Sequence, residues 1–190
     1  MKAVELMQKR RTVRKFAQNP VPREDLLRMV ECARLAPSAA NIQPLKYLVI
    51  SSEQLCVKVF ELTAWAGYLR GLGTPGEGER PTAYIAVLGD TEIKKTGFEL
   101  DAGAAAMSII LAAEEQGIAS CWIGSVNRKA AYPLLGLDEK YNIIALIALG
   151  YPAENPVLED AADNIKYFKD ENGVLHVPKR PLDEIIVDFK

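Results

Sequence analysis

The feature that most constrains this chain is an apolar run of small and branched residues at positions 100–116. The run has helical spacing, and Gly117 stands where a helix commonly ends on a left-handed residue. Its apolar residues lie nearly all around the helix instead of along one stripe. A helix of this kind needs cover on most sides, so we expect it to be central and buried.

Short β-prone segments and amphipathic helices fill the rest of the first 150 residues. Residues 142–149 are apolar on both faces, which predicts a strand in the interior of a sheet. Residues 67–81 hold five glycines and two prolines, so they predict an irregular surface loop. A chain of 190 residues suffices for one α/β domain over 1–190. We also expect helices at 3–9, 23–36, 54–62 and 128–135, and strands at 46–50, 83–88 and 119–123.

The tail at 151–190 differs from the body because it is polar and holds four prolines. Asn172-Gly173 predicts a hairpin turn between short β-prone pairs. A second β-prone run, IIV, lies at 185–187. A tail of this composition packs poorly on its own, so we expect it to wrap a partner subunit.

Composition excludes several classes of function. The net charge of −2 argues against a general nucleic-acid binder, whose domain is usually basic. One histidine and three widely spaced cysteines supply no ligand set for a metal, so no metal site is expected. The N-terminus lacks the apolar run of a signal peptide, and no apolar stretch is long enough for a bilayer. These features predict a cytoplasmic protein with no membrane partner.

Two segments predict recognition of a polar ligand. Arg10, Arg11 and Arg14 surround Thr12, and guanidinium and hydroxyl groups bind phosphate. The alternative is a solvated basic helix end. Residues 37–44 (PSAANIQP) combine small side chains with two amides, which suits a heterocycle carrying both donors and acceptors, although a plain connecting loop has the same composition.

Two further segments have weaker signals. In residues 121–125 (CWIGS), Gly124 allows the main chain to approach a flat ring closely, while Trp122 either stacks or fills core. Lys179-Arg180 is a second cationic pair, and such pairs are usually solvated.

Taken in order, these segments resemble the FMN-dependent nitroreductase family. The matching stretches are 10–16 (RRTVRKF), 36–44 (APSAANIQP), 101–106 (DAGAAA), 120–125 (SCWIGS) and 179–184 (KRPLDE). The chain departs from the family pattern at Met107, where glutamine is frequent, and at Lys179-Arg180, which are adjacent instead of one residue apart. The 67–81 loop also differs from that of the larger members.

The resemblance implies a fold, a cofactor and a set of contacts. The fold is a three-layer α/β (α+β) sandwich with a mixed or antiparallel sheet, in a homodimer whose C-terminal extensions wrap the partner and whose interface holds FMN. Arg14 and Gly124 are the flavin-tuning candidates, the latter through its amide near N5. The implied FMN-contacting residues are Arg10, Arg11, Thr12, Arg14, Pro37, Ser38, Ala39, Asn41, Gln43, Ile123, Gly124, Ser125, Lys179 and Arg180.

The resemblance further implies an oxidoreductase that passes electrons from NADH or NADPH through FMN to a small organic acceptor, such as a nitroaromatic or a quinone, with ping-pong kinetics. The cofactor performs the chemistry, so no protein acid or base is required. Trp65 and Tyr68 either line the pocket or are packing aromatics. The alternatives are reductive dehalogenation, flavin breakdown, or a flavin-binding protein without turnover.

Overall fold

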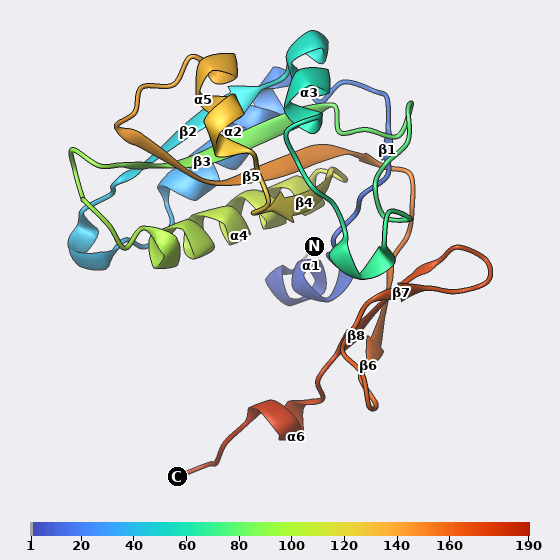
Figure 1. Ribbon diagram of the computed structural model, residues 1–190. Helices are drawn as coiled ribbons and strands as arrows, with labels where there is room; N and C mark the ends of the chain where they lie inside the picture. The colour runs from blue at the N-terminus through green and yellow to red at the C-terminus, as the bar shows by residue number, and fades with distance from the viewer. Residues whose placement is uncertain (1) are drawn as a thin grey trace.

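The computed structural model describes residues 2–190 and shows a three-layer sandwich with a projecting C-terminal arm (Figure 1). Strand β5 pairs with three neighbours in the central sheet, which places it in the interior as its apolar pattern predicts. All pairings within this sheet are antiparallel. The strands are β1 (Phe16–Ala17), β2 (Leu45–Ile50), β3 (Ala83–Asp90), β4 (Ala119–Ile123) and β5 (Tyr141–Pro152).

Helices cover both faces of the sheet. The side chains of β3 alternate between the two layers, because Ile85 and Val87 pack in one core while Tyr84, Ala86 and Leu88 pack in the other. Each large apolar side chain buried in these cores contributes about 1.5–3 kcal/mol. One layer contains α2 (Arg23–Arg34) and α4 (Glu99–Glu115), the other contains α3 (Glu53–Phe60) and α5 (Arg128–Leu135), and α1 (Ala3–Lys9) lies beside α4.

Helix α4 is central, but it is not covered on every side. Its sheet-facing and α2-facing residues, such as Ala106 and Ile109, are fully buried. A stripe on another face stays half-buried, and no other part of the described chain covers it completely. The sequence predicted that the helix is buried on most sides, and this stripe is the part that other residues of the chain bury only partly. It consists of Gly103, Ala104, Met107, Ser108 and Leu111.

The arm after β5 forms a small sheet of its own. Strand β8 (Leu175–Lys179) pairs parallel with β6 (Val157–Asp160) and antiparallel with β7 (Phe168–Lys169). The predicted hairpin turn is confirmed, and Gly173 there has a φ of +78°, which favours glycine. Figure 1 shows the arm extending away from the sandwich.

The β-prone run at 185–187 does not form a strand in the arm. Its first residue ends α6 (Leu182–Ile185), and the two residues after it are irregular. Pro181 precedes this helix, and Asp183 and Glu184 lie in its first turn, where acidic residues are favoured. No other strand of the described chain lies beside the run, so its β-propensity has no hydrogen-bonding partner.

The helices and strands from α1 to β5, apart from β1, agree with the predicted ones to within a few residues, whereas β6 and α6 had no predicted counterpart. Strand β1 was not predicted, because two residues are too few to show a period. The two loops predicted as irregular each contain a single 3-10 turn, at Ala39–Asn41 and Gly67–Leu69. Within residues 2–190, no helix is both long enough and apolar enough to span a bilayer.

Candidate cofactor-binding site

The basic segment lies against strand β4. Thr12 forms a parallel bridge with Ser120, and the Val13 amide donates to the Ser120 carbonyl at 3.1 Å. Because β4 ends at Ile123 and leads directly to Gly124, the fold brings the basic segment and the predicted ring-facing segment onto one side of the sheet.

The first two arginines of this segment have different surroundings. The Nε of Arg10 is buried and has no hydrogen-bond partner in the described residues. Arg11 is only 8% exposed and donates to the Gln8 carbonyl. Burial, and after it the adjacent Arg10 charge, lower the pKa of Arg11 from its ordinary value. Arg11 lines a cleft of about 210 Å³ that also contains Glu114. An unpartnered guanidinium N–H is a group that a phosphate would satisfy.

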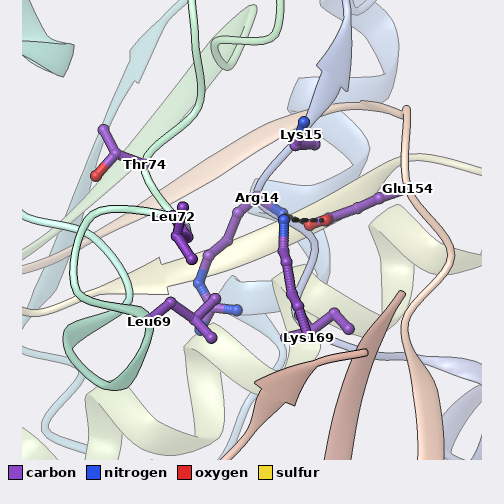
Figure 2. A pocket seen from close by; sticks show the side chains of 9 residues that line it. Arg14, Lys15, Leu69, Leu72, Thr74, Glu154 and Lys169 are labelled. Carbon is purple, nitrogen blue, oxygen red and sulfur yellow. Dashed lines mark hydrogen bonds and ion pairs between the residues drawn. The ribbon is translucent and has the colours of Figure 1, made fainter. Parts of the chain in front are cut away.

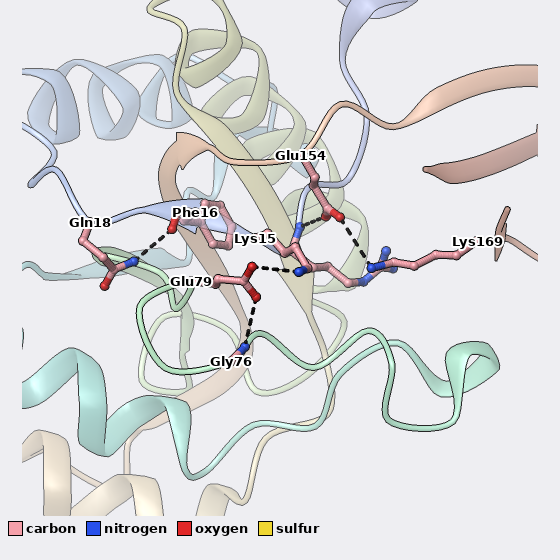
Figure 3. Close-up of polar contacts among 8 residues, drawn as sticks. Lys15, Phe16, Gln18, Gly76, Glu79, Glu154 and Lys169 are labelled. Carbon is pink, nitrogen blue, oxygen red and sulfur yellow. Dashed lines mark hydrogen bonds and ion pairs between the residues drawn. The ribbon is translucent and has the colours of Figure 1, made fainter. Parts of the chain in front are cut away.

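Arg14 is held by the C-terminal arm and by the segment leading into it. Its main-chain N–H donates to Glu154 Oε1 at 2.6 Å, and Lys169 Nζ lies 3.9 Å from Glu154 Oε2 (Figure 3). Its guanidinium lies over the ring of Tyr167, 4.7 Å from the centroid. Figure 2 shows the Arg14 side chain pointing between Leu69 of the glycine-rich loop and Lys169.

The loop before β2 is fastened to the first turn of α4. Ser38 Oγ donates to Asp101 Oδ2 at 2.9 Å, and the Ala39 amide lies 3.3 Å from Asp101 Oδ1. Ser38 Oγ also accepts a hydrogen bond from the main-chain N–H of Gln43 at 3.0 Å. The buried carboxylate therefore fixes both ends of the short loop through one serine.

Three residues of this loop adopt the left-handed conformation that side chains disfavour. Ala40, Asn41 and Gln43 have φ values of 50°, 53° and 53°. Strained backbone of this kind is concentrated at ligand-binding segments. The loop borders a cavity of about 190 Å³ that also contains Tyr47. Burial, and then the Asp101 charge, raise the pKa of Tyr47 to about 12, so its hydroxyl stays protonated.

The segment after β4 presents open main chain. A Cβ built on Gly124 would meet no described atom within 4 Å, which leaves room for a flat ring. Trp122 is 41% exposed, so it does not fill core. Cys121 is buried, and burial raises the pKa of its thiol to about 11; it therefore offers no thiolate at neutral pH. The Ser125 carbonyl accepts from the Ala64 amide at 3.0 Å.

The second cationic pair lies in the arm. Lys179 ends β8 and is exposed, and Arg180 pairs with Glu184 at 3.2 Å. Among residues 2–190, no hydrogen bond or ion pair joins either residue to the basic segment. Their role as phosphate contacts stays a prediction.

The predicted contacts fall into two groups at opposite ends of α4. Ser38 binds Asp101 in the first turn, whereas Arg11 lines a cleft with Glu114 in the last turn. These two acids are 13 positions apart in the helix, which is about 20 Å at 1.5 Å per residue. Pro37, Ser38, Ala39, Asn41 and Gln43 therefore lie far from the basic segment of their own chain.

Sequence reasoning missed three residues that shape the site. Asp101 lies in a motif of the resemblance, but nothing in its spacing showed that it binds Ser38. Glu154 and Tyr167 contact Arg14 from more than 130 residues away, and no local pattern reports such contacts. Of the two aromatics near the loop, Trp65 is a packing residue, because it is buried and lies against Phe60. Tyr68 is exposed beside Tyr167.

Comparison with known proteins gives a consistent result. The sequence model of the Nitroreductase family matches residues 7–67 and 78–151. A protein of Archaeoglobus fulgidus with the provisional name NADH dehydrogenase/NAD(P)H nitroreductase is 30% identical over 161 residues, covering 81% of this chain and 87% of that protein.

Solved structures agree in fold. The nitroreductase family protein of Streptococcus pneumoniae superposes with a TM-score of 0.74 at 23% identity, covering 99% of this chain and 100% of that one. A nitroreductase of Desulfovibrio desulfuricans, solved in complex with FMN, gives 0.72 at 25% identity, covering 98% and 96%. With the family model matching most of its length, this chain belongs to the nitroreductase family.

Proposed function

We propose that this protein is an FMN-dependent oxidoreductase that passes electrons from NADH or NADPH to a small organic acceptor, such as a nitroaromatic or a quinone. The observation that carries the proposal is the arrangement around β4. A buried, unpartnered Arg10 Nε lies in a basic segment that is bridged to β4, and β4 leads to a glycine with open space above it. The family membership and the FMN complex of the Desulfovibrio relative support it.

The residues present fit FMN as the cofactor. Arg10, Arg11 and Thr12 would bind the phosphate and the ribityl chain, assisted by Lys179 or Arg180 from an arm. Exposed amides of the strained 38–43 loop suit the polar edge of an isoalloxazine ring. When bound, FMN supplies the capacity to accept two electrons from a nicotinamide and to release them to an acceptor.

We infer that the complete site requires a homodimer. The two groups of contacts lie about 20 Å apart at the two ends of α4 in one chain. A second copy packed antiparallel along α4 would exchange these ends and bring the loop of one subunit to the basic segment of the other. The half-buried stripe of α4, which includes Gly103 and Ala104, allows such close packing.

The chain's own residues would act mainly through fixed charge and position. Arg14 would stabilise negative charge at the pyrimidine end of the reduced ring. Fixed charges of this kind usually make a large contribution to lowering the activation free energy. Gly124 would present a main-chain amide and leave one ring face open. Because donor and acceptor would use this same face in turn, we infer ping-pong kinetics. Within the described site no thiolate is available, since the Cys121 thiol stays protonated.

Absorption spectroscopy and rapid mixing test the proposal together. We expect purified protein to be yellow and to release FMN on denaturation. Anaerobic mixing with NADH or NADPH should bleach the flavin band, and a nitroaromatic or quinone should restore it. Protein that takes up no FMN at high excess contradicts the proposal. Bound flavin that neither donor bleaches would instead indicate a binding protein without turnover.

A further inference from the structure

Two segments that the family model does not match meet in this structure. They are residues 68–77, in the glycine-rich loop, and residues 152–190, which include the C-terminal arm. The structure brings these segments together beside Arg14. Leu69, Leu72 and Thr74 from the loop, and Glu154 and Lys169 from the other segment, line one small cavity with Arg14 (Figure 2).

An aromatic pair makes the contact between the two segments. The rings of Tyr68 and Tyr167 lie 5.0 Å apart and are tilted by 51°. The Arg14 guanidinium also lies over the Tyr167 ring, 4.7 Å from its centroid, and Lys166 Nζ lies 5.8 Å from the centroid of the Tyr68 ring. Two cation–π contacts and one tilted ring pair therefore link the loop, the arm and the basic segment.

Carboxylates hold the surroundings of Arg14 without neutralising its side chain. Glu154 accepts the main-chain N–H of Arg14 and pairs with Lys169, while Glu79 pairs with Lys15 at 2.7 Å (Figure 3). Among the described residues, the Arg14 guanidinium forms no ion pair. An aromatic ring orients a guanidinium and leaves its charge available, whereas a paired carboxylate would cancel much of that charge.

We propose that Tyr167 is a positioning residue for Arg14 and that the ring of Tyr68 supports Tyr167. The arm thereby fixes the position of the positive charge that tunes the potential of the bound flavin. This inference rests on the proposed function, since it requires Arg14 to face FMN. It gives the arm a second task besides contact with a partner subunit. Both tyrosines lie outside the residues that the family model matches.

The test measures the midpoint potential of bound FMN in the purified holoprotein. Tyr167→Leu removes the ring face, whereas Tyr167→Phe keeps it and removes only the hydroxyl. Losing the cation–π contact between Tyr167 and Arg14 should lower the affinity for reduced FMN relative to oxidised FMN by about three- to tenfold. For a two-electron couple, tenfold corresponds to about 30 mV, so the potential of Tyr167→Leu should fall by about 15–30 mV. Tyr167→Phe should keep the wild-type potential.

A neighbouring residue supplies the matched control. Phe168 follows Tyr167 in the sequence and begins β7. Its ring stacks on His176 with 4.8 Å between the centroids, and it makes no cation–π contact with Arg14. Phe168→Leu should therefore disturb the small sheet and leave the potential unchanged. If Tyr167→Leu does not fold, Tyr68→Leu replaces it, with a smaller shift expected in the same direction.

Several results would overturn the inference. An unchanged potential in Tyr167→Leu, or in Tyr68→Leu where that variant replaces it, shows that the rings do not act through Arg14. An equal shift in Tyr167→Phe or in Phe168→Leu shows that the ring face is not the cause. Wild-type protein that binds no FMN overturns the proposed function as well, whereas wild-type binding with unshifted variants overturns only this inference.

Discussion

The hydroxyl of Ser38 donates a 2.9 Å hydrogen bond to the carboxylate of Asp101, which joins the loop before β2 to the first turn of α4. Asp101 is only 5% exposed, so a buried charge determines the shape of the loop. Hydrogen bonds to charged groups are stronger than neutral ones and are costly to leave incomplete. The strained conformations of Ala40, Asn41 and Gln43 follow directly after this anchor.

Asp101→Asn should lower the free energy of unfolding of the FMN-free protein by about 1.5–3 kcal/mol, because a neutral amide cannot accept from both the Ser38 hydroxyl and the Ala39 amide as a carboxylate does. Urea unfolding followed by circular dichroism measures the change. Ser38→Ala is the graded control and should cost about 1 kcal/mol. Coincident unfolding curves for wild type and Asp101→Asn would show that the anchor contributes nothing.

Arg10→Ala should weaken FMN binding on the order of ten- to a hundredfold, because a charge-assisted hydrogen bond contributes about 1.5–3 kcal/mol. Arg10 is chosen because its buried Nε lacks a partner in the described residues. Fluorescence titration of FMN measures the affinity. The control is Arg28→Ala, since Arg28 is exposed on α2 and lines neither of the clefts described at the site. Equal affinities in the two variants would remove Arg10 from the site.

Gly124→Ala should weaken FMN binding without changing the stability of the fold. The added methyl group meets open space, so the free energy of unfolding should change by less than about 0.5 kcal/mol. FMN binding should weaken by about 1–3 kcal/mol, the usual cost of an extra methyl group in a filled site. Gly150→Ala is the opposite case, because its Cβ would lie 2.9 Å from Phe16 Cδ1 and should destabilise the fold. Retained FMN affinity in Gly124→Ala would argue against ring contact there.

Deleting residues 180–190 should impair dimerisation more than folding. This segment carries side chains that nothing in the described chain covers, including Val187, which is 100% exposed. The core elements do not depend on it. Sedimentation velocity measures the dimer, and circular dichroism measures the fold. A truncated chain that still sediments as a tight dimer would show that the wrapping role is wrong.

His176 should make the small sheet of the arm sensitive to pH. Its Nδ1 lies 2.9 Å from Glu159 of β6, and its Nε2 lies 3.6 Å from Asp170 after β7. Hydrogen bonding to Glu159 is the largest cause that raises the pKa of His176 above 6.5. Hydrogen bonding to the Val174 amide is the largest cause that lowers the pKa of Asp170 below 3.8.

The directions of these two pKa shifts define a pH range in which both residues stabilise the small sheet. Stabilisation by His176 is complete below pH 6.5 and is lost as pH rises through the raised pKa, whereas that by Asp170 is complete above pH 3.8 and is lost on acidification. Protection factors for amide hydrogen exchange in β6 to β8, which correct for the intrinsic pH dependence of exchange, should therefore be highest between these values. His176→Phe keeps a ring and removes the charge, so its protection factors should not fall as pH rises above 6.5. An unshifted titration of this single histidine by NMR would refute the assignment.

Local chemistry in the sequence determined most of the elements. The apolar pattern of β5 placed it in the sheet interior, Asn172-Gly173 gave the hairpin, and Gly117 ended α4 with a φ of +71°. These signals are local, because periodicity and turn conformation depend on neighbouring residues. At 185–187 the local β-propensity was not enough, since it produces a strand only where another strand supplies hydrogen bonds.

The surroundings of the candidate site were decided by tertiary structure. Sequence alone identified Arg10, Arg14 and Gly124 as candidates, but it did not show that Glu154 and Tyr167 hold Arg14. Such contacts join segments about 140 and 153 positions apart, and they arise from the path of the chain around the sheet. No periodic pattern encodes that path, because it results from packing two cores at once.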